Sequence, residues 1–287
     1  MFLSIRNLLA QKPMIRAMEA HSGLSAMIVE NAKSENKIFD AIWLSSLTDS
    51  TVKGKPDIEF VDLTSRLVTV NDILEVTTKP IIYDGDTGGL PNHFALTIKR
   101  LERLGVSATI IEDKTGAKRN SLLNPGENLH VQDSIENVCE KIRIGKQAQN
   151  TADFMIIARI ESLIVEAGMQ DALTRAGAFL EAGADGIMIH SRKKDGAEIL
   201  EFCGHYNKFE NRKPLVAVPT NYPSLGEQVL QDAGINIVIY ANQLLRASYT
   251  AMLKTANSIL EHGGSFVADK EYISALELLN LIEGNQC

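Results

Sequence analysis

ATIIEDK, at residues 108–114, is a short apolar stretch that ends in three charged residues. Its β-branched run, Ala108–Glu112, has the length and composition of a strand that is buried on both faces, as the strands of parallel sheets are. Seven other stretches repeat this pattern along the chain: Ile15–Glu19, Ala41–Ser45, Pro80–Asp84, Phe154–Arg159, Gly186–His190, Leu215–Pro219 and Asn236–Ala241. The sequence therefore predicts eight short strands.

Helical patterns separate the predicted strands. In His93–Leu104, the apolar Phe94, Ile98 and Leu101 recur at helical spacing among charged residues. Similar patterns occupy Gln132–Gln147, Asp171–Glu181, Glu198–Tyr206, Ser224–Ala233 and Asn242–Glu261. Alternating strands and helices indicate a parallel sheet with crossover connections. Eight such units in 287 residues predict an α/β fold, a (β/α)8 TIM-type barrel, with a doubly wound open sheet as the alternative.

Composition limits the class of protein. The chain is 45% hydrophobic and 23% charged, and its net charge of −7 argues against a nucleic-acid partner while leaving an anionic substrate open. Three cysteines (Cys139, Cys203 and Cys287) have no metal-ligand spacing and cannot all pair, which favours free thiols in a reducing cytoplasm. Arg6 interrupts the apolar start of the chain, so neither a signal peptide nor a membrane span is expected.

The C-terminal part of the chain continues beyond the eighth predicted unit. Because no Pro- or Ser-rich linker divides the sequence, we expect residues 1–287 to form a single barrel domain that carries a helical extension over residues 263–287. A helix is predicted at Lys270–Ile282. Its apolar residues recur at intervals of three: Ile273, Leu276, Leu279 and Ile282. A barrel with eight helices of its own has little room for them, so we expect this extension to pack on a neighbouring subunit.

Acidic residues follow two of the predicted strands. In a barrel of this type the active site lies at the carboxyl ends of the strands. Asp84 and Asp86 follow the third strand and Glu112 follows the fourth, and residues two apart on an extended strand share a face. Oxygen ligands without His or Cys favour Mg²⁺ or Mn²⁺ over Zn²⁺. The three carboxylates are therefore metal candidates, unless Asp86 only begins a turn before a helix.

Basic and amide side chains follow other strands. Arg159 ends the fifth strand, where a guanidinium could bind a phosphate or carboxylate group or pair with Glu161 or Glu112. His190 ends the sixth strand, as a functional group or as a satisfied core histidine. Lys118 and Asn120 lie in the long connection after the fourth strand, which is either a solvated loop or a source of donors for an oxyanion.

These residues resemble those of a known family. Glu112-Asp-Lys114, five residues and Asn120-Ser121 match the E-D-K-x5-N-S signature of the phosphoenolpyruvate mutases, within the isocitrate lyase superfamily. Other matching stretches follow in the family's order: Glu19–Ser25, Trp43, Asp84–Gly88, Ala158–Glu161, Ala182–Gly186, His190-Ser191, Val218–Thr220 and Asn242 to Ala247. The resemblance runs from about Met18 to Asn257. It implies an enzyme that interconverts phosphoenolpyruvate and phosphonopyruvate in phosphonate biosynthesis.

The resemblance also implies a role for each matching residue. Asp84 would bind Mg²⁺ directly, or Mn²⁺ in its place, while Asp86 and Glu112 act through water. The catalytic positions would be Asp57, Lys118, Asn120, Arg159 and His190. The substrate-binding positions would be Trp43, Ser45, Ser46, Leu47 and Ser121. Members of this superfamily exchange terminal helices between subunits, which implies a homotetramer or homodimer. The expected partner is a small-molecule substrate.

The chain departs from the family pattern at two places. Ser46 stands where the family has Gly after its second strand, and Gly88-Gly-Leu-Pro-Asn92 replaces a turn that usually carries an aromatic residue and Gly-Asn. Two related functions are the alternatives. A phosphonopyruvate hydrolase would carry Thr at Asn120. A carbon–carbon lyase would carry Cys in the connection after the fourth strand, where this chain has none.

Overall fold

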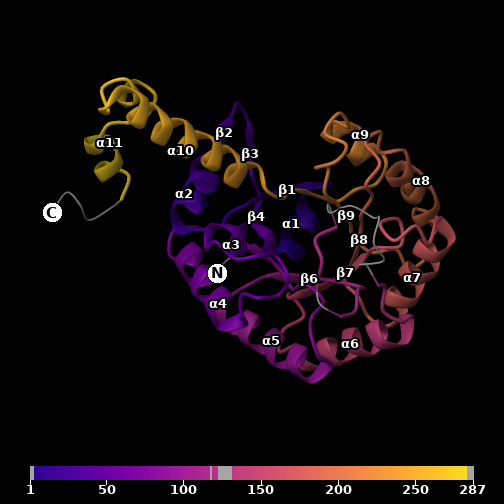
Figure 1. Cartoon of the computed structure of the whole chain (residues 1–287). Coiled ribbons are helices and arrows are strands. Elements are labelled where there is room, and N and C mark those ends of the chain that lie inside the picture. Colours follow the sequence, from indigo (N-terminus) through magenta and orange to yellow (C-terminus); the bar gives the residue numbers. More distant parts are fainter. Residues whose placement is uncertain (1–2, 117, 122–130, 283–287) are drawn as a thin grey trace. The chain divides into compact units, whose positions relative to one another are not determined.

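The structure is a computed structural model that describes residues 3–116, 118–121 and 131–282, and Figure 1 traces the chain. Cys287 and part of the connection 113–131 lie outside the described residues. The chain divides into two compact units, Met1–Asn242 and Gln243–Cys287. The boundary follows the eighth barrel strand, so the helix predicted at Asn242–Glu261 belongs to the second unit.

The first unit is a closed barrel of eight parallel strands (Figure 1). In order around the barrel they are β1 (Ile15–Glu19), β4 (Ala41–Leu44), β5 (Ile81–Asp84), β6 (Ala108–Glu112), β7 (Met155–Ile160), β8 (Gly186–Ile189), β9 (Leu215–Ala217) and β10 (Ile237–Tyr240). Because β1 pairs with both β4 and β10, the sheet has no open edge. The predicted barrel is confirmed and the open sheet is excluded. A separate antiparallel hairpin joins β2 (Lys33–Ser34) to β3 (Lys37–Ile38).

Helices alternate with the strands and form the outer layer of the barrel. Those of the first unit are α1 (Ile5–Gln11), α2 (Gly23–Asn31), α3 (Ser46–Val52), α4 (Leu63–Leu74), α5 (Pro91–Leu104), α6 (Ile135–Ala148), α7 (Met169–Glu181), α8 (Ala197–Tyr206) and α9 (Glu227–Asp232). The connection between β4 and β5 contains α3 and α4, neither of which the sequence patterns predicted. All five helices predicted within this unit are confirmed to within three residues.

Side-chain alternation along the strands fills the barrel and lines its mouth. On β6, Ala108 and Ile110 belong to the interior core, and Glu112 follows on the same face. On β7, Met155 and Ile157 are followed in the same way by Arg159. Since period-2 alternation continues to the end of each strand, the last inward residues face the mouth of the barrel rather than its core.

Helix α1 closes the opposite end of the barrel. Ile5 and Leu8 are buried in the same core cluster as the inward strand residues. The Ile5 amide donates a hydrogen bond of 2.7 Å to the hydroxyl of Ser107, which directly precedes β6. This contact places α1 at the amino ends of the strands. The carboxyl ends are left for the site.

The second unit consists of α10 (Gln243–His262), a short 3₁₀ turn (Ala268–Lys270) and α11 (Ala275–Asn280). The helix predicted at Lys270–Ile282 is therefore shorter than expected at both ends. Neither α10 nor α11 contains a buried residue. Large apolar side chains are exposed along the unit, among them Leu260 at 82% and Leu276 at 68%. No helix among the described residues is long and apolar enough to cross a membrane.

Candidate active site

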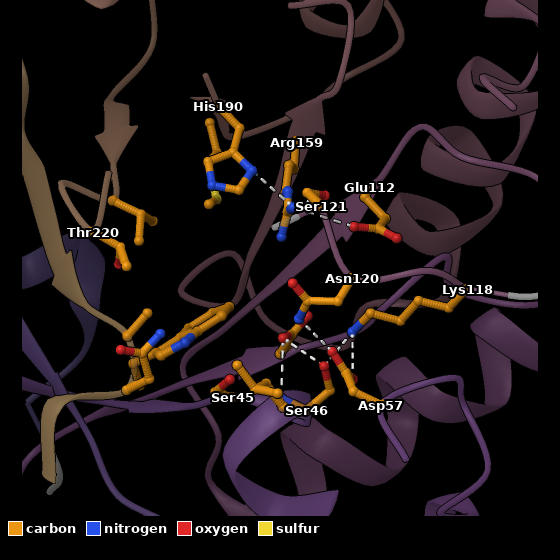
Figure 2. A pocket seen from close by; sticks show the side chains of 17 residues that line it. Ser45, Ser46, Asp57, Glu112, Lys118, Asn120, Ser121, Arg159, His190 and Thr220 are labelled. Carbon is orange, nitrogen blue, oxygen red and sulfur yellow. Dashed lines mark hydrogen bonds and ion pairs between the residues drawn. The ribbon is translucent and has the colours of Figure 1, made fainter. Parts of the chain in front are cut away.

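A pocket lies at the carboxyl ends of the barrel strands (Figure 2). It is lined by Trp43, Ser45, Ser46, Leu47, Asp57, Asp84, Glu112, Lys118, Asn120, Ser121, Arg159, Met188, His190, Val218, Thr220, Ala241 and Asn242. Its free volume is about 60 Å³, so the pocket is small. Every candidate site residue from the sequence lines this pocket except Asp86, which lies behind the lining and contacts Lys118.

One side of the pocket, here called the acidic wall, consists of Ser46, Asp57, Asp84, Asp86 and Lys118. Asp84 ends β5 and accepts hydrogen bonds at Oδ2 from the Ser46 amide, at 3.0 Å, and from the Ser46 hydroxyl, at 2.9 Å. Burial alone would raise the pKa of Asp84, but the positive charges of Lys118 and Arg66 outweigh it and lower the pKa to about 2. Asp84 is therefore ionised. The serine that replaces the family's glycine adds a hydrogen bond to this carboxylate.

Lys118 supplies the positive charge of the acidic wall. Its ammonium group is buried and contacts Asp86. It also contacts the Ser46 hydroxyl and lies 3.1 Å from Asp57 Oδ1 (Figure 2). Burial opposes its charge, yet the surrounding carboxylates raise its pKa above the usual range. A single ammonium group thus lies among several carboxylates. The alternative reading of Lys118 as a residue of a solvated loop is wrong.

The turn after β5 needs a glycine and a left-handed residue to bring these carboxylates together. A Cβ atom at Gly85 would lie 2.7 Å from Thr109 Oγ1 and 3.0 Å from the Ile110 carbonyl oxygen, so only glycine fits. Asp86 follows with φ of +53°, a conformation that costs energy in a residue with a side chain. Asp86 is nevertheless held there, and burial raises the pKa of its carboxyl group.

The donor set of the acidic wall fits a hard divalent cation. Asp84 offers carboxylate oxygens beside the buried Lys118, and the other acceptors of the acidic wall are carboxylate and hydroxyl oxygens. Within the described residues, no three Asp, Glu, His or Cys side chains are arranged to bind one ion together. The geometry is compatible with a single direct carboxylate ligand and with further carboxylates that act through water.

Asn120 and Asp57 link the acidic wall to the segment after β6. The Asn120 side-chain amide donates a hydrogen bond of 2.7 Å to Asp57 Oδ2, and both residues line the pocket (Figure 2). Lys118 approaches the other oxygen of the same carboxylate. Asp57 thus holds the Asn120 amide on one carboxylate oxygen and the Lys118 ammonium group on the other.

The other side of the pocket, here called the basic wall, consists of Lys114, Ser121, Arg159 and His190 with the carboxylates of Glu112 and Glu161. Arg159 donates from Nε to Glu161 Oε1 at 2.5 Å and from Nη2 to the Ser121 hydroxyl at 2.8 Å. Lys114 lies 3.3 Å from Glu112 and 3.2 Å from Glu161. The predicted pairing of Arg159 with acidic residues is confirmed, and it coexists with a place in the pocket.

His190 is neutral in this environment. Burial lowers its pKa, and the nearby Arg159 guanidinium lowers it further. Arg159 Nη2 lies 2.9 Å from His190 Nδ1 (Figure 2), and because a guanidinium only donates, Nδ1 accepts. The proton of the neutral ring is then on Nε2. The 3.3 Å contact from Nδ1 to Glu161 is consequently no hydrogen bond in this tautomer.

Glu112 lies beside Lys114 and Arg159 in the basic wall. Burial raises its pKa to about 7, which Arg159 and Lys114 only partly offset. Its Oε1 atom is buried and accepts no hydrogen bond from the described residues, although it faces Lys114. A bound cation or an additional donor would satisfy this oxygen.

Sequence patterns did not reveal all the residues that support the pocket. Arg66 on α4 contacts Asp84 and Asp86, but it belongs to a helix that was not predicted. Lys114 was seen only as part of a motif, yet its ammonium group donates to Ser121 Oγ and to the Arg119 carbonyl oxygen, both at 2.9 Å. Its position directly after a buried strand was the available signal.

Comparisons with known proteins agree on one family. The family model described as phosphoenolpyruvate phosphomutase matches residues 5–260. A phosphoenolpyruvate phosphomutase from Tetrahymena pyriformis is 37% identical over 258 residues, which cover 90% of this chain and 83% of the relative. The crystal structure of a phosphoenolpyruvate phosphomutase from Streptomyces platensis subsp. rosaceus superposes with a TM-score of 0.89 at 32% identity, covering 96% of this chain and 93% of the other. A phosphonopyruvate hydrolase crystallised with oxalate and Mg²⁺ superposes at 0.86 and 33% identity, covering 96% and 93%.

Proposed function

We propose, since the chain belongs to the phosphoenolpyruvate phosphomutase family, that it is an enzyme that interconverts phosphoenolpyruvate and phosphonopyruvate. The O–P bond of phosphoenolpyruvate breaks, and a C–P bond forms at C3 of the same pyruvate unit. One observation carries the proposal: an acidic wall suited to a cation faces a wall that presents Arg159, His190 and the nearby Asn120 amide. Such a pocket can bind the two ends of a phosphorylated carboxylic acid.

A magnesium ion is the proposed cofactor. Asp84 would bind it, with Asp86 and Glu112 acting through water, and Mn²⁺ could take its place. When bound, the ion would neutralise the negative charge that develops on the carboxylate and enolate oxygens of the substrate. Support comes from the hard oxygen donors of the acidic wall and from the Mg²⁺ in the related hydrolase crystal.

The basic wall is proposed to hold the migrating phosphoryl group. A loose, metaphosphate-like group carries its charge on three equatorial oxygens and needs positioned donors around them. Arg159 is kept in place by Glu161 and Ser121, so its guanidinium loses little freedom on binding. The neutral His190 would offer its Nε2 proton to the same group. Asn120, oriented by Asp57, would donate from the opposite side.

Substrate binding is assigned to the residues near the start of α3. Ser45 and Leu47 line the pocket, and Ser46 begins the helix with its amide directed at Asp84. Trp43 adds a buried aromatic surface on the inward face of β4. We assign the pyruvate part of the substrate to this region, because Ser45, Ser46 and Leu47 line the pocket next to the Asp84 carboxylate that is proposed to bind the metal ion.

Water must be kept from the phosphoryl group, because hydrolysis would give pyruvate and phosphate instead of a rearranged product. The small free volume of the pocket supports this exclusion. Phosphonopyruvate hydrolase is the second candidate function, since a structure of that enzyme superposes almost as well as the mutase structure. The asparagine at position 120 favours the mutase, as threonine is expected there in the hydrolases.

Phosphorus NMR of the purified protein with phosphonopyruvate and Mg²⁺ tests the proposal directly. The mutase reaction gives the phosphoenolpyruvate resonance without an increase in free phosphate. Release of phosphate as the main product would assign the hydrolase activity. If neither product forms with an intact fold, the chain acts on another acid.

The C-terminal unit is proposed to mediate assembly into a homodimer or homotetramer. Ile273, Leu276, Leu279 and Ile282 are all at least 46% exposed, and α11 buries nothing in the single chain. Apolar side chains that remain uncovered in one chain favour a protein partner. Deletion of residues 269–287 should lower the mass measured by light scattering. An unchanged mass would refute this proposal.

The cellular role follows from the reaction. Phosphoenolpyruvate is the more stable partner, so we propose that an enzyme that consumes phosphonopyruvate acts next in phosphonate biosynthesis.

A cytoplasmic location is proposed on the state of the thiols. Cys139 and Cys203 are buried and free, and burial raises the pKa of Cys203 to about 12, so neither is a reactive thiol.

A further inference from the structure

Arg66 lies behind the acidic wall and is 4% exposed. It comes from α4, so it reaches the turn after β5 from the outer layer of the barrel. Its Nη1 atom donates two hydrogen bonds, at 2.7 Å to the Asp84 carbonyl oxygen and at 2.9 Å to Asp86 Oδ2. Both bonds therefore go to the same three-residue turn, on either side of Gly85.

The other atoms of this guanidinium make weaker contacts. Nε lies 3.5 Å from Asp49 Oδ2, and the group stacks 4.2 Å from the centre of the Tyr83 ring. Neither Nε nor Nη2 makes a hydrogen bond to the part of the chain that the structure describes, although both atoms are buried. The strong hydrogen bonds of Arg66 are thus confined to the Asp84–Asp86 turn. A buried arginine cannot lose its proton, so this cation is permanent.

Asp86 is divided between two cations as a result. Oδ2 accepts from Arg66, while Oδ1 contacts Lys118 on the pocket side. Asp86 also has a left-handed backbone, which is unfavourable without support from its surroundings. Arg66 provides that support, because its Nη1 atom donates both to the Asp84 carbonyl oxygen and to the Asp86 carboxylate.

We propose that Arg66 is a positioning residue for the cation site: it fixes Asp86 so that Oδ1, and not Oδ2, faces the pocket. The inference rests on the proposed metal site and extends it to a residue that contacts neither the pocket nor the substrate. Partners that orient metal ligands typically change metal affinity by about 10- to 100-fold when they are removed. Arg66 also adds positive charge near the site, which repels a cation. The gain in cation affinity from a fixed Asp86 carboxylate is larger than the loss from this repulsion.

The test measures Mn²⁺ binding to the full chain without substrate. Electron paramagnetic resonance detects the ion that remains free. Arg66→Met removes both hydrogen bonds and should raise the Mn²⁺ Kd by about 10- to 100-fold. Arg66→Lys keeps the charge but cannot bridge the two oxygens in the same way, and should weaken binding about 10-fold. If Arg66→Met does not fold, Arg66→Lys decides the question.

Arg16→Met is the matched control. Arg16 Nε lies 2.8 Å from both carboxylate oxygens of Glu227, so the variant also deprives a carboxylate of its guanidinium, but away from the pocket. Its Mn²⁺ affinity should equal that of the parent. If folded Arg66 variants bind Mn²⁺ with parental affinity while Asp84→Ala loses binding, the role of Arg66 is refuted but the metal site is not. Parental affinity in Asp84→Ala would instead refute the metal site itself.

Discussion

The acidic wall and the basic wall are both buried and both charged, but they balance their charges differently. In the basic wall, Lys114 and Arg159 face Glu112 and Glu161, and His190 is neutral. In the acidic wall, three aspartates face Lys118 in the pocket, with Arg66 behind them. By count of charged residues, the basic wall pairs two cations with two carboxylates, whereas the three aspartates of the acidic wall outnumber Lys118 and Arg66 by one. By that count, a cation from outside would balance the acidic wall.

The two walls also differ in how their residues are held. Glu112, Arg159 and His190 lie at the ends of neighbouring strands, so barrel register fixes them. Asp57 and Lys118 come from connections, and Asp86 has a left-handed backbone. Preorganised donors suit a group that must be held through a reaction. The acidic wall depends instead on supports from outside the strands, such as Arg66.

Loss of the proposed metal ligand, Asp84, should have the largest effect. Asp84→Ala removes the carboxylate that both Ser46 groups orient, and turnover should fall by at least about 1000-fold, because a metal ion contributes several kcal/mol to such a reaction. Excess chelator should have the same effect on the parent, reversed by Mg²⁺ or Mn²⁺. Asp72→Ala, at an exposed site on α4, is the control. Full turnover of the parent in excess chelator would mean that the acidic wall does not need a bound cation.

Asn120 tests the boundary between the walls. Removing one donor to a transition-state oxyanion costs about 100- to 1000-fold in rate, so Asn120→Ala should lose most mutase turnover and keep Mn²⁺ binding. Asn120→Thr should release more phosphate relative to phosphoenolpyruvate than the parent does, as measured by phosphorus NMR. Parental mutase rates in Asn120→Ala would mean that the amide does not hold the phosphoryl group.

Ser121 tests the rigidity of the basic wall. Its hydroxyl accepts from Lys114 and Arg159, and it donates to Glu161 at 2.5 Å. Ser121→Ala leaves buried partners unsatisfied and should lower the free energy of unfolding by about 1–3 kcal/mol in urea titrations, while also raising KM.

Ser162→Ala is the matched control for Ser121→Ala. The Ser162 hydroxyl is buried and bonds Asp171 and Gln132, none of which lines the pocket. It should lose a similar stability with an unchanged KM. Equal KM values in both serine variants would show that Ser121 stabilises the fold without preparing Arg159 for substrate.

His190 should give the smallest effect, a change in the pH dependence of stability. Its pKa is lowered in the folded state, so below about pH 6.5 the unfolded chain binds a proton that the folded chain does not. Stability from this group is present above that pH and is lost as the pH falls, by at most about 1.4 kcal/mol per pH unit. His190→Asn should remove this part of the slope in urea titrations at several pH values. An NMR titration of His190 with a pKa above 6.5 would contradict the assignment.

Much of the fold was accessible from the sequence because the signals are local. Ile15–Glu19 and Ala108–Glu112 were predicted with their observed bounds, since a buried parallel strand is a continuous apolar run. The strand ends at Asp84, Glu112, Arg159 and His190 were accessible for a related reason. Strand alternation and the rule that active sites lie at the carboxyl ends place such residues at one mouth before any contact is known.

The contacts between the walls and their supports depend on the closed barrel. Arg66 is 18 residues from Asp84, and Lys118 is 72 residues from Ser46, and no spacing rule relates such positions. The same holds for the division of the chain after Asn242, because compactness is a property of folded contacts. Sequence alone thus determined the barrel, its mouth and the residue types there. The tertiary structure decided which charges neutralise one another, because electrostatic partners are set by distance and burial in space, not by order along the chain.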